Sequence, residues 1–349
     1  MRTWFTTTAK KGQFREDEAF LTGMAGRLSA SPIKRYQMAE APEKADIIVY
    51  FEPNQYKGQD YARTLLSEKL IQDYPNKCFV VNYDDGPIGF LPGLYVGMPR
   101  SKMDCSRFKP GTYMGQYNIL CPVIAEKRDS VAPQLLFSFR GSTSAEVRKR
   151  IFAANFPDKD IAIQQTFAWF NHTEEEKREY LQEMLNSKFV LCPRGLSTVS
   201  IRLFETMELG RVPVILSDEW VEPDGPSWPE CSIRVSESKI SELPAILRSY
   251  EPQAAEMGRQ ARVAWEQWFS PEMRVVRTME YFESLILQRD ASHDEREYQT
   301  KWLSLGFAWE NGWTPLQSAG RAIQQGALLE KVKSKLSKNQ KQPYSEIEP

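Results

Sequence analysis

Short apolar runs alternate with helical patterns twice along this chain, and that alternation restricts the fold more than any other feature. In the first series, the apolar run 45–53 is followed by a helical pattern over 59–75 and a second apolar run over 77–87. The second series repeats the order of strand, helix and strand at 188–192, 199–209 and 212–216. A strand, a helix and a strand in close succession form a βαβ unit, which implies a parallel sheet. We therefore expect an α/β fold with a parallel sheet in each half.

The length of 349 residues predicts about two domains, since a domain takes roughly 100–200 residues. A proline-containing stretch over 122–133 is a plausible linker between them. We predict a Rossmann-like domain over 1–125 and a second over 126–290. Helices over 291–338 are expected to pack back on the first domain, and the polar tail 339–349 is expected to be disordered.

The overall composition excludes several classes of protein. The net charge is -1, so no global field attracts nucleic acid, and nucleic-acid binding is not expected. No run approaches the ~18 apolar residues that a membrane-spanning helix needs, and the first residues lack the apolar core of a signal peptide. We expect a cytoplasmic protein without a transmembrane segment. The partly basic end of the chain leaves peripheral membrane contact as an alternative.

The residues that commonly bind transition metals are few and scattered. The chain has only two histidines, His172 and His293, and its five cysteines form no CxxC pair. We therefore expect no metal site and interpret the cysteines as reduced thiols of the core.

The stretch FVLCPRGLSTVSIRLFE, residues 189–205, places polar groups where a strand passes into a helix. The backbone N–H groups in the first turn of a helix have no partner within the helix and therefore favour the binding of an anion. The planar guanidinium of an arginine can donate two parallel hydrogen bonds to phosphate oxygens. A carboxylate one turn later suits sugar hydroxyls. Two alternatives remain: hydroxyls that only cap the helix, and a surface ion pair between the arginine and the glutamate. The candidate residues are Gly195, Ser197, Thr198, Ser200, Arg202 and Glu205.

Other charged residues also follow predicted strands. Arg140 follows the strand 135–139, next to Gly141 and several hydroxyls. Ligands of open parallel sheets bind beyond the carboxyl ends of the strands, so this loop and the previous one can close on one anion. Asp84 and Asp85 follow the run CFVVNY, and Glu52 ends the strand before it. A solvated turn is the plain alternative for the aspartates.

The segments FVLCPRG, SIRLFE, GRVPVILSD and FSFRG together resemble the exostosin family of glycosyltransferases. The resemblance covers about residues 133–285 and is specific over 188–218. It implies a GT-B fold, in which two Rossmann-like domains face each other across a cleft. The C-terminal domain would hold the nucleotide sugar. A final helix would cross back to the first domain, with 317–338 as the candidate here.

The resemblance also implies roles for individual residues. Arg202 would contact the diphosphate of a nucleotide sugar, with UDP as the nucleotide, and Glu205 the ribose hydroxyls. Arg140 would bind the phosphates from the facing loop. Ser197, Thr198 and Ser200 would donate to phosphate oxygens. Animal members are lumenal and membrane-anchored, and this chain shows neither signal nor anchor, so it looks like a bacterial-type cytoplasmic member.

The resemblance thus implies an inverting glycosyltransferase that needs no metal and acts in polysaccharide or glycan synthesis. Asp84, Asp85 and Glu52 are the candidates for the base that deprotonates the saccharide acceptor. Asp218 would approach the donor sugar. The arginines and the helix start would stabilise the leaving nucleoside diphosphate. Two alternatives are a catalytically silent subunit that binds a glycan or a partner, and another nucleotide enzyme such as an epimerase.

Overall fold

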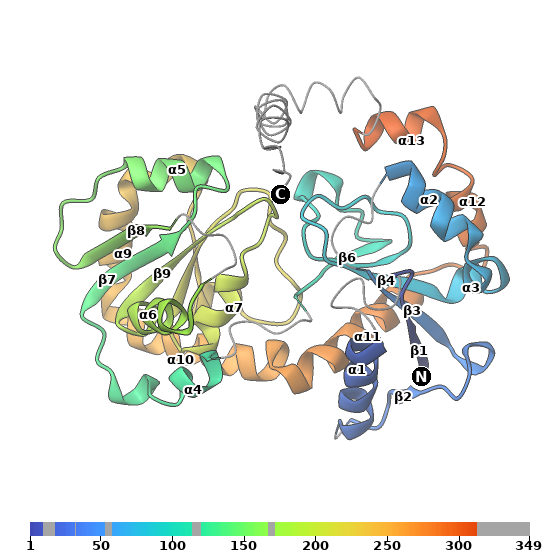
Figure 1. Cartoon of the computed structure of the whole chain (residues 1–349), viewed down its shortest axis with the longest axis horizontal. Coiled ribbons are helices and arrows are strands. Elements are labelled where there is room, and N and C mark those ends of the chain that lie inside the picture. Colours follow the sequence, from blue (N-terminus) through green and yellow to red (C-terminus); the bar gives the residue numbers. More distant parts are fainter. Residues whose placement is uncertain (10–17, 32, 53–57, 114–119, 167–171, 313–349) are drawn as a thin grey trace, which may run out of the picture.

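The computed structural model describes the chain except for residues 10–17, 32, 53–57, 114–119, 167–171 and 313–349. Two parallel sheets form, one in each half of the chain, and helices surround them (Figure 1). The predicted α/β class with two Rossmann-like domains is therefore confirmed.

The first sheet has six strands in the order β2-β1-β3-β4-β5-β6, and every neighbouring pair is parallel. Its central strands are buried on both faces, which explains why their sequences are almost continuously apolar. The strands are β1 (Arg2–Thr6), β2 (Gln37–Met38), β3 (Ile47–Glu52), β4 (Cys78–Asn82), β5 (Gly93–Tyr95) and β6 (Phe108–Pro110). The helices of this half are α1 (Glu18–Ala30), α2 (Gly58–Ser67) and α3 (Lys69–Asp73).

The second sheet has five parallel strands in the order β11-β10-β9-β7-β8. Its strands are β7 (Leu135–Gly141), β8 (Ile161–Gln165), β9 (Ser187–Pro193), β10 (Val212–Leu216) and β11 (Ile233–Arg234). The direction of winding reverses between β7 and β9, so the crevice beyond their carboxyl ends is the expected ligand site.

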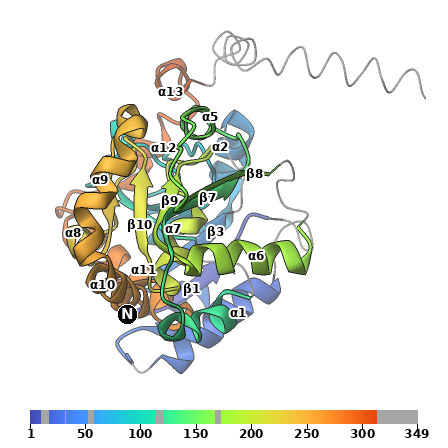
Figure 2. The ribbon, with the colours of Figure 1, turned by 90° about the vertical axis from the view of Figure 1, so that its left-hand side faces the viewer.

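Helices cover both faces of the second sheet. Figure 2 shows α9 on one side of the strands and α6 on the other. Along β9, Phe189 and Leu191 pack in one apolar cluster while Val190 and Cys192 pack in another, as strand alternation requires. The helices are α4 (Cys121–Ala125), α5 (Glu146–Ala153), α6 (Glu174–Leu185), α7 (Ile201–Glu208), α8 (Trp228–Cys231), α9 (Leu243–Tyr250) and α10 (Ala254–Ala264). The predicted linker 122–133 thus begins within a helix, α4, which packs on α6 and α7.

The long helix α11 (Pro271–Leu287) joins the two halves (Figure 1). Ser270 caps its N-terminus with a hydroxyl that accepts from the Met273 amide, and the helix packs on α1 and β5 of the first domain. Phe282 of this helix lies 5.2 Å from Phe79, measured between ring centres. Two short helices, α12 (Glu295–Gln299) and α13 (Leu305–Glu310), follow on the first domain. The predicted crossing segment 317–338 and the tail 339–349 lie outside the described residues.

Candidate active site

The loop 194–200 joins β9 to α7 at the reversal point of the second sheet. The end of β7 lies beside it, because a Cβ built on Gly141 would sit 3.2 Å from Nη2 of Arg202. The start of the loop is equally close to the segment after β7, since a Cβ on Gly195 would sit 3.5 Å from the Ser144 hydroxyl. The fold therefore brings the two loops predicted from sequence together.

Arg202 lies in the first turn of α7 with its guanidinium buried between aromatic rings. Its Nε donates to the Tyr180 hydroxyl at 3.1 Å, and its Nη2 donates to the Arg140 carbonyl at 2.5 Å. The guanidinium carbon lies 4.7 Å from the centre of the Phe139 ring. The third nitrogen, Nη1, is buried without a hydrogen-bond partner among the described residues. A buried donor on a cation is costly to leave unpaired, so this atom favours an incoming anion.

Glu205 is also buried, and its Oε2 accepts from the Tyr180 hydroxyl at 2.7 Å. Arg202 is 8% exposed and Glu205 is 5% exposed. The alternative of a surface ion pair between them is therefore wrong. Burial holds the pKa of Tyr180 well above its usual value, so its hydroxyl keeps its proton and links Arg202 to Glu205.

The three hydroxyls of the loop have different surroundings. Ser200 occupies the position before the helix, but its side chain makes no capping bond. The Ser197 hydroxyl accepts a long bond of 3.5 Å from the Val199 amide. Thr198 lines a cleft, and its Oγ1 is buried without a partner among the described residues. The capping alternative therefore does not account for Ser200, and Thr198 has a hydroxyl free to bind a ligand.

Arg140 ends β7 and turns its guanidinium toward α6. It forms ion pairs of 3.1 Å with Glu179 and Glu183. Burial raises the pKa of Glu183, while Arg140 acts in the opposite direction. The backbone carbonyl of Arg140 contacts Arg202, so Arg140 belongs to the site through its main chain. A contact between its side chain and phosphate remains a prediction.

Arg148 of α5 is a residue that the sequence reasoning missed. Its Nε donates to the Arg194 carbonyl at 3.0 Å and its Nη2 to the Pro193 carbonyl at 3.3 Å, which holds the start of the loop. Burial, and then repulsion from Arg202, lowers the pKa of Arg148 to about 10. In the described part of the chain, the hydrogen bonds of both arginines go to carbonyls and a phenol, and to no carboxylate. The crevice therefore combines two cations with too little negative charge to balance them.

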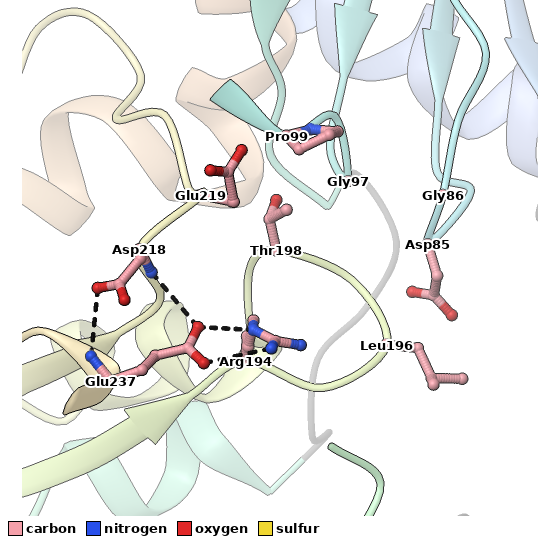
Figure 3. Close-up of a pocket in the computed structure, with 10 residues that line it drawn as sticks. All are labelled: Asp85, Gly86, Gly97, Pro99, Arg194, Leu196, Thr198, Asp218, Glu219 and Glu237. Atoms are coloured by element: carbon pink, nitrogen blue, oxygen red, sulfur yellow. Dashed lines mark hydrogen bonds and ion pairs between the residues drawn. The ribbon is translucent and has the colours of Figure 1, made fainter. Parts of the chain in front are cut away.

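A cleft of about 430 Å³ separates the two domains in front of this loop (Figure 3). Its lining residues come from both domains: Asp85, Gly86, Gly97, Pro99, Arg194, Leu196, Thr198, Asp218, Glu219 and Glu237. Rossmann-like domains that face each other across a cleft form the GT-B arrangement expected from the sequence.

The loops of the second domain that border the cleft are held by hydrogen bonds. Arg194 pairs with Glu237 at 2.7 Å, and the amide of Glu237 donates to Asp218 at 3.2 Å (Figure 3). The predicted role of Asp218 at the donor sugar remains a prediction. Its position beside the cleft is compatible with that role.

The three candidate bases differ in their surroundings. Asp85 is half-buried, lines the cleft and points toward the loop of the second domain (Figure 3). Asp84 is buried and accepts from the Gly86 amide at 2.8 Å, as in a turn. Glu52 is fully buried and accepts from the amide and the hydroxyl of Thr8 at 3.1 and 2.8 Å. Asp85 is thus the best placed of the three to meet a ligand.

Residues 123–250 match the family model of the Exostosin GT47 domain. This part of the chain is an exostosin domain. The resemblance found in the sequence is thereby confirmed for the half that carries the arginines and Glu205.

Curated proteins that match part of this chain are exostosins as well. Exostosin-1 of Drosophila melanogaster is 33% identical over 116 residues, which are 31% of this chain and 15% of that protein. Exostosin-1 of Bos taurus is 30% identical over 111 residues, again 31% of this chain and 15% of the relative. The match thus spans about one seventh of the length of these relatives.

The solved structures that the chain resembles are distant in sequence. An α1,3-fucosyltransferase is 12% identical, with a TM-score of 0.46 over 84% of this chain and 92% of the other. Anabaena HepE, solved in complex with UDP, is 12% identical, with a TM-score of 0.30 over 70% of this chain and 65% of the other.

The exostosin domain contains every donor-side candidate, including Arg148. The candidate bases Glu52, Asp84 and Asp85 lie outside it, in the first domain. The donor-side candidates and the candidate bases therefore come together only because the first domain packs against the exostosin domain.

Four of the cysteines are buried, as expected for core thiols, but Cys105 is exposed, so that expectation is wrong for this residue. Burial raises the pKa of both Cys78 and Cys192 to about 12, which keeps these thiols protonated. Within the described residues, no histidine, cysteine and carboxylate side chains gather in a group able to hold a metal ion. The described helices include none that is long and apolar enough to cross a membrane.

Proposed function

We propose that the chain transfers a sugar, with inversion, from a nucleoside-diphosphate sugar to a saccharide acceptor in polysaccharide or glycan synthesis. The observation that carries the proposal is the arginine pair at the reversal point of the second sheet. Arg148 and Arg202 are held there without a carboxylate partner among the described residues, and Nη1 of Arg202 has no acceptor. A diphosphate would supply both the missing acceptor and the missing charge. UDP is proposed because of the resemblance to the exostosin family.

On the donor side, the diphosphate would lie over loop 194–200 at the N-terminus of α7. Arg202 would donate through Nη1, and Thr198 through its hydroxyl, which has no partner among the described residues. Glu205, oriented by Tyr180, would accept from the ribose hydroxyls. The charge that develops on the leaving diphosphate would then meet donors already in place, which is the most effective form of transition-state stabilisation.

On the acceptor side, we propose Asp85 as the base. Its carboxylate would take the proton from the acceptor hydroxyl as that oxygen bonds to the anomeric carbon. The bond between this carbon and the phosphate oxygen breaks in the same step, and the nucleoside diphosphate leaves. A single displacement of this kind inverts the anomeric centre.

The test is a titration of the full chain with UDP, GDP, ADP and CMP, with and without EDTA, following the thermal stability. A ligand at 100 times its Kd adds about 2.7 kcal/mol to the free energy of unfolding. We expect one nucleotide to stabilise the wild type in the presence of EDTA, and the Arg202→Lys variant to lose most of that effect. If no nucleotide stabilises the wild type, the proposed donor site is wrong.

Arg211→Lys is a matched control. Arg211 is another buried arginine of the same domain, and its Nε donates to the Leu185 carbonyl at 2.8 Å, away from the loop. Its replacement should lower stability but leave the nucleotide-induced shift unchanged.

A catalytically silent binding subunit is the second candidate. It is favoured by the commitment of Glu52 and Asp84 to hydrogen bonds within their own domain. Nucleotide binding without hydrolysis of any nucleotide sugar, and without transfer to any saccharide, would favour this alternative.

A further inference from the structure

A second cavity of about 420 Å³ lies on the first domain, and residues of the helices α12 and α13, which follow α11, form part of its lining. None of its residues belongs to the exostosin domain. Its lining includes Met98, Ser101, Lys102, Asp104, Arg107, Tyr298, Lys301, Trp302, Phe307 and Glu310.

The inner part of this cavity is apolar and aromatic. Trp302 is only 1% exposed and packs on Phe90 at 5.3 Å between ring centres, so it forms a rigid floor. Tyr298 and Phe307 are half-buried and offer ring surface to the cavity. The Arg107 guanidinium lies 3.5 Å from the centre of the Tyr298 ring and fixes its orientation. Aromatic ring surface that lines a cavity suits the apolar faces of sugar rings.

The rim of the cavity is polar and electrically balanced. Lys102 and Lys301 supply two cations, and Asp104 and Glu310 supply two carboxylates. The remaining charged residue of the lining, Arg107, pairs with Glu295 at 3.0 Å, a carboxylate that it shares with Arg289 at 3.4 Å. A rim that mixes donors and acceptors without net charge suits a neutral molecule with many hydroxyls better than an anion.

A thin wall separates this cavity from the cleft. Gly97 and Pro99 line the cleft, whereas Met98 and Ser101 line the second cavity, so one stretch of chain faces both.

The wall is tied to the second domain. The Arg100 amide donates to the Glu219 carbonyl at 2.8 Å, and the Ser101 amide donates to its carboxylate at 3.1 Å. The second cavity therefore keeps a fixed distance from the cleft.

We propose that this cavity binds the non-reacting part of a neutral oligosaccharide whose end reaches the cleft. The inference rests on the proposed function for the identity of the cleft as the reaction site. Saccharide binding by the cavity is measured separately from nucleotide binding and from transfer.

The experiment probes a microarray of defined neutral and acidic oligosaccharides with the full chain. The wild type should retain neutral oligosaccharides. Tyr298→Ala should lower the signal about tenfold, and Tyr298→Phe, which keeps the ring, should restore it. A double variant, Lys301→Ala with Glu310→Ala, should also lose about tenfold, and both positions are exposed, so folding is not at risk. The matched control is Lys239→Ala with Glu242→Ala, an exposed pair in the second domain.

Three results would overturn the proposal: no neutral oligosaccharide retained, acidic oligosaccharides retained alone, or equal retention by the wild type and the cavity variants. UDP titrations of the same proteins separate the two hypotheses. Cavity-dependent retention without any nucleotide binding would remove the proposed donor site and leave the saccharide cavity standing. Nucleotide binding without cavity-dependent retention would remove the saccharide cavity and leave the proposed donor site standing.

Discussion

The hydroxyl of Tyr180 on α6 donates a 2.7 Å hydrogen bond to the carboxylate of Glu205 on α7. The same hydroxyl accepts from Nε of Arg202 at 3.1 Å. One phenol thus sets the positions of the cation and the carboxylate that the proposed donor site requires.

Replacing Tyr180 with phenylalanine should weaken the site and the fold together. The buried Glu205 carboxylate would lose a donor, and hydrogen bonds to charged groups contribute about 1.5–3 kcal/mol. We expect a loss of that size in the free energy of unfolding, measured by urea denaturation, and at least tenfold weaker nucleotide binding. Tyr281→Phe is the control, since the Tyr281 hydroxyl donates to the Asp224 carbonyl at 2.6 Å. Equal nucleotide affinity in the two variants would argue against a positioning role for Tyr180.

Thr198→Val should separate ligand binding from stability. The Thr198 hydroxyl is buried without a partner among the described residues, so its removal deletes an unsatisfied polar group. We expect unchanged or slightly higher stability, by up to about 1 kcal/mol, together with weaker nucleotide binding. Thermal unfolding with and without the nucleotide measures both effects. Thr206→Val is the contrasting variant, because the Thr206 hydroxyl donates to the Arg202 carbonyl at 2.7 Å. Unchanged affinity of the Thr198 variant would exclude its hydroxyl from the donor site.

The strands and the main site loop could be predicted because their signals are local. The strand expected over 188–192 is β9 at 187–193, and the strand expected over 212–216 is β10 with the same bounds. Hydroxyls and an arginine between a buried strand and a helix indicate an anion site from spacing alone. The side of the sheet on which this site lies follows from the parallel topology.

The partners of these side chains could not be predicted, because they depend on packing between distant segments. Nothing near Arg140 indicates that Glu179 and Glu183 pair with it, since those residues lie some forty positions further along the chain. Arg148 could have been recognised as a candidate from the sequence, because, like Arg202, it lies in the first turn of a helix that follows a strand. The segment 317–338, which is predicted to cross back to the first domain, lies outside the described residues; in the described structure α11 packs on α1 and β5 of that domain.

The pH dependence of stability should contain a contribution from Glu208. Burial raises the pKa of Glu208 above its ordinary value of 4.5, with Cys121 and Arg262 acting in the opposite direction. The folded state therefore favours the protonated acid. The contribution of protonated Glu208 to the stability of the fold is complete below pH 4.5. It is lost as the pH rises through the pKa that Glu208 has in the folded state.

Glu208→Gln removes this titration, so the variant should gain stability relative to the wild type as the pH rises above 4.5. Each unit of pKa shift corresponds to about 1.4 kcal/mol. Urea denaturation of both proteins between about pH 4 and 8 measures the difference in their free energies of unfolding. This range starts near the ordinary pKa of a carboxyl group and extends above it. A difference for Glu208→Gln that stays constant over this pH range would contradict the raised pKa.

The ion pair between Arg107 and Glu295 should hold α12 and the roof of the second cavity on the first domain. Arg107 Nη2 lies 3.0 Å from Glu295 Oε2, and both side chains are almost fully buried. Glu295→Gln would leave the Arg107 cation, and the nearby Arg289, without a counter-charge. Breaking a buried pair in this way costs about 3–5 kcal/mol.

Urea denaturation should show a loss within that range, and hydrogen exchange should rise first in α12 because this carboxylate anchors the helix. Asp46→Asn is the comparison, since its pair with Arg2 is exposed and such pairs contribute less than about 1 kcal/mol. Equal losses in the two variants would mean that α12 is held by the apolar contacts of Trp302 alone. The cavity would then keep its roof without the ion pair, and saccharide retention would survive the Glu295 change.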